Sequence, residues 1–133
     1  MQDVRWKQRF ANFERAFSNF IIVLNGLKEN QDNLIYKMAT VQAYEMVFEL
    51  SWKTLKDFLK EKRVQVEFPR DVIKESFAYE IIEDGEIWIK MLDDRNATVH
   101  TYDEQKANEV VNDIKNKYYP AIEQVYNYFK KEL

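Results

Sequence analysis

Residues 6–27, WKQRFANFERAFSNFIIVLNGL, decide the fold. Their apolar side chains recur at alternating steps of four and three, which places one continuous apolar stripe along a long helix. The stripe consists of Trp6, Phe10, Phe13, Phe17, Phe20, Leu24 and Leu27. Asp3 is a plausible N-cap for this helix, and Gly26 lies where we expect the helix to end.

The next segment repeats this pattern over a greater length. Polar residues 28–33 predict a loop, with Asp32 or Asn33 capping the helix that follows. The second stripe consists of Leu34, Met38, Val41, Glu45, Phe48, Trp52, Leu55 and Leu59. Glu45 is the exception, because a carboxylate on an apolar face is costly unless it is paired. Either Glu45 reaches solvent at the helix edge, or it pairs inside the bundle with Arg95 or Tyr102.

Three further helices are expected in the second half of the chain. Residues 61–68 break the pattern, and Pro69 then begins a short helix. The acidic residues 83–86 begin a fourth helix, where negative charge complements the helix dipole. The last helix begins near Thr101 or Asp103, and Pro120 predicts a kink near Asn116. Its stripe consists of Ala107, Val111, Ile114, Tyr118, Ala121, Val125 and Tyr128.

The composition agrees with a helical domain. The chain has 133 residues, 46% of them apolar, and only two Gly and two Pro, too few for a fold rich in tight turns. We therefore expect one domain over residues 1–133, an all-α, antiparallel up-and-down four-helix bundle with a short extra helix. No apolar run approaches the roughly 20 residues of a membrane span, no stretch resembles a signal peptide, and Cys is absent, so we expect a cytoplasmic protein.

The amino-acid composition also argues against several kinds of binding site. A net charge of -3 with interspersed signs does not predict nucleic-acid binding by bulk electrostatics. One His and no Cys argue against a structural zinc site, and two glycines cannot form a Gly-rich phosphate loop. We therefore expect neither a metal nor a cofactor.

Residues 95–102, RNATVHTY, contain the only His of the chain between an Arg and a Tyr. These three side chains suit phosphate esters, because Arg offers a fixed fork of donors, His titrates near neutral pH and Tyr carries a reactive hydroxyl. On one uninterrupted helix Arg95 and His100 would point about 140° apart. They can serve one phosphate only if the helix ends near Val99, or if a second copy of the chain completes the site across a two-fold axis.

The same residues also have purely structural interpretations. A single His at a helix end commonly caps the helix or interacts with its dipole. Arg95 follows Asp93 and Asp94, so it can equally form a structural ion pair.

The segment matches the Arg-x4-His-x-Tyr pattern of HEPN-domain proteins. The resemblance extends to RWKQRF (5–10), FELSWKTLK (48–56), PRDVI (69–73), DGEIW (84–88) and YDE (102–104). Together these stretches resemble the nucleotidyltransferase substrate-binding protein family, which comprises stand-alone HEPN proteins, HepT-like partners of a minimal nucleotidyltransferase. The resemblance implies a HEPN-like bundle similar to the helical domain of aminoglycoside nucleotidyltransferases.

The resemblance implies two functions. One is a substrate-binding or regulatory subunit that forms a homodimer and complexes with a separate minimal nucleotidyltransferase, as a toxin–antitoxin type pair. The other is a metal-independent endoribonuclease toxin, acting on RNA and neutralised by adenylylation of its motif Tyr. Carried over by position, Arg95 and His100 would be the catalytic pair, Asn96 would support them, and Tyr102 would accept the AMP. Glu45 would be a binding partner of this group.

Overall fold

The computed structural model describes residues 5–97 and 103–133. Its elements are α1 (Arg5–Glu29), α2 (Leu34–Glu61), α3 (Pro69–Ala78), α4 (Gly85–Asn96), α5 (Glu104–Asp113), the π-helical segment η1 (Ile114–Tyr118) and α6 (Tyr119–Glu132). All regular structure in these two ranges is helical, which confirms the predicted all-α class. The predictions for Asp3, Val99, His100, Thr101 and Tyr102 concern positions outside the described residues.

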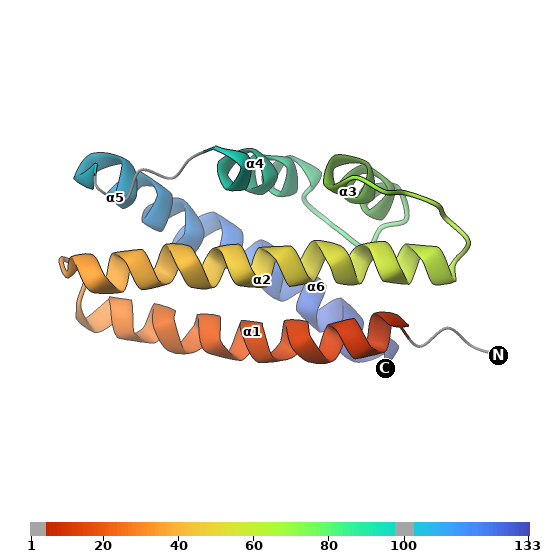
Figure 1. The fold of residues 1–133 in the computed structure, drawn as a ribbon, viewed down its shortest axis with the longest axis horizontal. Helices are drawn as coiled ribbons and strands as arrows, with labels where there is room; N and C mark the ends of the chain where they lie inside the picture. The colour runs from red at the N-terminus through yellow and green to blue at the C-terminus, as the bar shows by residue number, and fades with distance from the viewer. Residues whose placement is uncertain (1–4, 98–102) are drawn as a thin grey trace.

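Two long helices, α1 and α2, run antiparallel along the molecule (Figure 1). The continuous run α5–η1–α6 crosses behind them, and α3 and α4 lie end to end along the other side of α2. α3 is the short extra helix, beginning at Pro69 as predicted. No helix among the described residues is long and apolar enough to cross a membrane.

The predicted stripe of α1 forms the centre of the core. Six of its seven members are buried, and Leu24 is half-buried. Trp6 packs edge-on against Phe58 of α2 at 5.2 Å between ring centroids, and against Phe129 of α6 at 5.5 Å. Because large aromatic rings bury the most apolar surface per residue, these contacts contribute strongly to the packing of α1 against α2 and α6.

The turn between α1 and α2 differs slightly from the prediction. α1 continues past Gly26 to Glu29, and Asn33 caps α2 by accepting a hydrogen bond from the Ile35 N–H at 2.9 Å. Gly26 is required by close packing rather than by the helix end, because a Cβ there would lie 2.8 Å from the Tyr36 ring.

The predicted stripe of α2 is only partly correct. Leu34 and Met38 are about half exposed, whereas Val41 and the stripe from Phe48 onward are buried. In its first half α2 also buries Thr40 and Tyr44, which are not members of the stripe. The cause is tertiary: Tyr44 contacts Met91 of α4 and Tyr118 of η1, and the apolar pattern alone does not indicate where these neighbouring helices lie.

Pro120 is accommodated without interrupting the last helix. The residues before it form the π-helical segment, in which the Tyr119 N–H donates to the Ile114 carbonyl five residues earlier. The wider turn inserts one residue into the helical repeat, so the buried face shifts by one position. Ile122 and Phe129 are fully buried where the strict 4-3 pattern predicts Ala121 and Tyr128, which are only half-buried, while Val125 is buried as predicted.

Candidate functional site

The end of α4 carries the first residue of the Arg-x4-His-x-Tyr pattern. α4 ends at Asn96, and Ala97 is extended, with φ −72° and ψ 141°. Arg95 is therefore in the last turn, where a cation complements the helix dipole. The helix that carries Arg95 therefore ends one residue after it. His100 and Tyr102 lie outside the described residues.

An ion pair ties Arg95 to α2. The Arg95 guanidinium contacts the Glu49 carboxylate, and its Nη1 donates to Asn96 Oδ1 at 2.9 Å. The side chains of Arg95 and Glu49 are 31% and 28% exposed. A guanidinium carries five N–H donors, so these contacts orient the group and leave donors available for an anion.

The Glu49 carboxylate is itself held by α2. Trp52 Nε1 donates to Glu49 Oε2 at 3.1 Å, and Lys53 Nζ lies 3.9 Å from the same oxygen. Trp52 is only 8% exposed, so its indole N–H depends on this acceptor. The carboxylate therefore links a buried aromatic residue of α2 to the guanidinium at the end of α4.

Glu45 is not the partner of Arg95. It is exposed on α2, and the carboxylate that pairs with Arg95 is Glu49, one turn further along the helix. Glu45 is thus solvent-facing and is not the carboxylate that pairs with Arg95, whereas its other predicted partner, Tyr102, lies outside the described residues. A signal for Glu49 was present in the sequence, because Trp52 and Lys53 follow it at helical contact spacing.

A second polar group fixes α4 to the π-helical segment. We call Lys90, Asp94, Asp113 and Tyr118 the α4 anchor network. Lys90 Nζ donates to Asp113 Oδ2 at 2.8 Å and to the Tyr118 hydroxyl at 2.9 Å, and it lies 3.6 Å from Asp94. The Tyr118 hydroxyl in turn donates to Asp94. Lys90 and Asp94 lie on α4, five residues and one residue before Arg95. The network therefore determines where the end of α4 lies.

Charge and burial shift the pKa values in this network. The hydrogen bonds to Asp113 and Tyr118 raise the pKa of Lys90 above its ordinary value. Burial, reinforced by the bond to Asp94, raises the pKa of the Tyr118 hydroxyl. Burial alone would raise the pKa of Asp113, but Lys90 and Lys117 outweigh it and hold that pKa below the ordinary value. Lys90 and Asp113 therefore remain ionised, and Tyr118 remains neutral, throughout the physiological range.

Tyr44 of α2 also contacts α4 and the π-helical segment. Its buried hydroxyl donates to the Met91 carbonyl at 2.8 Å, and its ring stacks on Tyr118 at 5.3 Å. Burial raises the pKa of this hydroxyl far above the ordinary value, so it acts as a permanent donor. The sequence patterns did not identify this role, because Tyr44 is not a member of the predicted stripe.

No group of three or more His, Cys, Asp or Glu side chains within residues 5–97 and 103–133 is placed to hold a metal ion. The chemistry available at this site from the described residues is that of an oriented guanidinium with an adjacent carboxamide, Asn96. Such a pair can bind a phosphate or a carboxylate.

The family described as "Nucleotidyltransferase substrate binding protein like" matches residues 8–131. The chain is 34% identical over 85 residues to a protein named probable ribonuclease HepT from Haemophilus influenzae. That match covers 60% of this chain and 57% of the relative, so the chain spans less than two thirds of the relative's length.

A solved structure shares the fold. It is the tri-AMPylated HEPN toxin of Shewanella oneidensis in complex with its MNT antitoxin. The match has a TM-score of 0.74, covers 98% of this chain and 99% of the other, and has 16% sequence identity. At that identity the likeness establishes the HEPN fold alone.

Proposed function

Because the chain belongs to the family described as nucleotidyltransferase substrate binding protein like, we propose that it is the helical subunit of a two-protein module. In this module it forms a homodimer and assembles with a separate minimal nucleotidyltransferase, as a toxin–antitoxin type pair. The observation that carries the proposal is the family match along residues 8–131, nearly the whole chain. A fold shared end to end with a HEPN toxin solved in complex with an MNT antitoxin supports it.

The exposed face of α2 supports the homodimer. Ile35, Met38 and Met46 are 74%, 48% and 56% exposed, and they lie on one face of α2 at helical spacing. The same face continues to Glu49, which holds Arg95. A second copy packed on this face would exclude water from the methionines and lie beside the Arg95 guanidinium, as an isologous dimer requires.

Co-expression tests the proposal directly. The tagged chain is co-expressed with the short nucleotidyltransferase encoded beside it, and the eluted species are measured by size-exclusion chromatography with light scattering. We expect a stable complex that contains two copies of this chain, and we expect Met38→Glu to yield one copy. Recovery of the wild-type chain alone would refute the assembly, and a wild-type monomer would refute the dimer.

A second function is favoured by the position of Arg95. We propose it as an alternative activity of the same dimer: metal-independent cleavage of RNA. The oriented guanidinium would stabilise charge on the scissile phosphate, with Asn96 beside it. His100 would transfer a proton to or from the 2′-hydroxyl or the leaving oxygen. AMP attached to Tyr102 would add bulk and negative charge two residues from His100 and block the site.

Growth and cleavage assays test this alternative. Expression of the chain alone is expected to arrest growth, and His100→Ala is expected to relieve the arrest while leaving the unfolding curve unchanged. Cleavage of labelled RNA by the purified chain is expected to persist in EDTA. Equal toxicity of the wild type and His100→Ala would contradict the assignment. Incubation with the nucleotidyltransferase and ATP, followed by mass spectrometry of Tyr102→Phe and the wild type, tests whether Tyr102 is the acceptor.

A further inference from the structure

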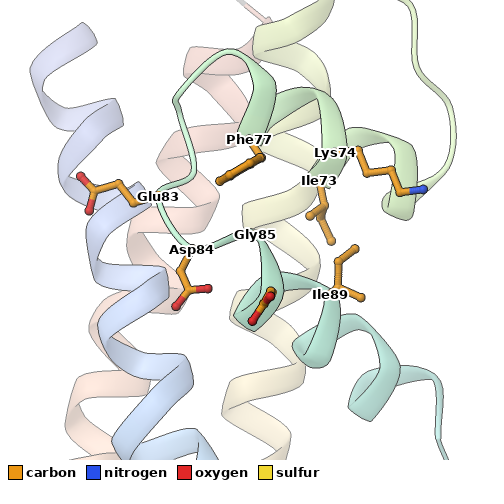
Figure 2. A pocket seen from close by; sticks show the side chains of 8 residues that line it. Ile73, Lys74, Phe77, Glu83, Asp84, Gly85 and Ile89 are labelled. Atoms are coloured by element: carbon orange, nitrogen blue, oxygen red, sulfur yellow. The ribbon is translucent and has the colours of Figure 1, made fainter.

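A pocket of about 630 Å³ opens between α3 and the beginning of α4 (Figure 2). Its centre is apolar: Ile73 and Phe77 come from one face of α3, and Ile89 comes from α4. Phe77 is 53% exposed although it packs against the backbone of Gly85, where an added Cβ would lie 3.2 Å from the ring. Phe77 thus exposes a large aromatic side chain to solvent, although it packs closely against the backbone at the start of α4.

Acidic residues form one edge of this pocket. Glu83, Asp84 and Glu86 are all exposed. Asp84 caps α4 by accepting from the Ile87 N–H at 3.1 Å, whereas no ion pair engages Glu83 or Glu86 within the described ranges. The backbone at this edge is fixed, since the Glu83 N–H donates to Gln124 of α6 at 3.2 Å. The edge therefore presents carboxylates at a defined place without a cation of its own.

The arrangement resembles a protein interface more than a small-molecule site. Small-molecule pockets bring a few polar groups together toward the ligand. Here the Glu83 carboxylate and the Lys74 ammonium extend away from the apolar centre, on opposite sides of it (Figure 2). An apolar centre surrounded by outward-pointing charges is the anatomy of a protein-docking surface, with Phe77 as its anchor. Three carboxylates against one ammonium require a partner that brings positive charge.

We propose that this α3–α4 pocket docks a basic segment of the minimal nucleotidyltransferase. A large apolar side chain of that segment seats against Phe77 and Ile89, and a neighbouring Lys or Arg pairs with Glu83 or Glu86. The inference rests on the proposed function, because it assigns a place to the partner that the proposed function requires. Arg95 lies ten residues after Gly85 on the same helix, about 15 Å along its axis. A transferase docked at the pocket thus leaves the Arg95 guanidinium open and lies within reach of the chain that follows α4.

Two substitutions with matched controls test the site. Affinity of the purified nucleotidyltransferase for immobilised chain is measured by biolayer interferometry at two salt concentrations. Phe77→Ser and Glu83→Lys are each expected to weaken binding about tenfold or more. Their controls, Ile22→Ser and Glu29→Lys, change an apolar side chain and a carboxylate that are likewise exposed, on α1. Both controls are expected to bind like the wild type, and Glu83→Lys is expected to reduce the salt dependence of binding.

The outcomes separate this inference from the proposed function. If Phe77→Ser and Glu83→Lys bind the nucleotidyltransferase as tightly as the wild type does, the docking site is overturned and the proposed assembly stands. Absence of wild-type binding overturns both. Tryptamine, an aromatic cation, is titrated in parallel by NMR. If tryptamine shifts the Phe77 and Ile89 signals saturably and the nucleotidyltransferase then fails to displace it, the pocket is a small-molecule site. That result would overturn the proposal. Circular dichroism melts confirm that the variants are folded.

Discussion

Breaking the contact between Glu49 and Arg95 tests the geometry on which the candidate site depends. Three substitutions separate its components: Arg95→Ala removes the guanidinium, Glu49→Gln removes the charge but keeps an acceptor for Trp52, and Glu49→Ala removes both. The Glu49/Arg95 double variant completes a thermodynamic cycle, which isolates the energy of the pair from the effects of each truncation.

The expected magnitudes follow from burial. Both side chains are about 30% exposed, so the pair lies between surface pairs, at about 0.2–1 kcal/mol, and fully buried ones. We expect a coupling energy of about 1 kcal/mol. Glu49→Ala also leaves the buried Trp52 N–H without its acceptor, which costs about 1–2 kcal/mol more. Its total loss is therefore about 2–3 kcal/mol, against about 1 kcal/mol for Glu49→Gln.

Urea unfolding followed by tryptophan fluorescence and circular dichroism measures these free energies. An unchanged m-value confirms that each variant unfolds from the same compact state. A coupling energy within about 0.3 kcal/mol of zero would refute the reasoning, because it would mean that Glu49 does not hold the guanidinium. Equal losses for Glu49→Gln and Glu49→Ala would refute the role assigned to the Trp52 hydrogen bond.

Three further predictions concern the scaffold. Tyr118→Phe keeps the ring but removes the hydroxyl from the α4 anchor network, so we expect a loss of about 1–2 kcal/mol in urea unfolding; no loss would contradict the network. Gly26→Ala gains helix propensity but forces Cβ against the Tyr36 ring, and we expect a net loss of about 1 kcal/mol, whereas a gain would show that the ring moves freely. Burial and the Glu14 carboxylate raise the pKa of Tyr126 to about 12, above its ordinary value of 10. Because the pKa is raised in the folded state, it contributes stability below pH 10, and this stability is lost between pH 10 and 12. We therefore expect the free energy of unfolding of Tyr126→Phe to fall less steeply than that of the wild type in this window. Equal slopes for the two proteins would contradict the prediction.

Much of the scaffold could be predicted because it depends on local spacing. The 4-3 repeat of α1, the Asn33 cap of α2 and Pro69 at the start of α3 each act within a turn or two of the chain. Such features are determined by neighbours in the sequence, so the structure confirms them.

The partner of Arg95 could not be predicted in the same way. Glu45 and Glu49 are one turn apart on α2, and both are compatible with a residue projecting from another helix. Which of them meets Arg95 depends on how far α4 is displaced along α2. That displacement is determined by the Tyr118 and Tyr44 contacts, which join residues far apart in the chain.

By itself the sequence determined the helical class, the order and approximate bounds of the helices, and the segment in which an Arg, a His and a Tyr gather. Helical periodicity carries this information because it depends on residues three and four apart. Only the tertiary structure decided that α2 exposes its first apolar turns, that a π-helical segment shifts the buried face of the last helix, and that Glu49 holds Arg95. These features depend on the rotation and offset of one helix against another, and those are set by how large side chains interlock across the core.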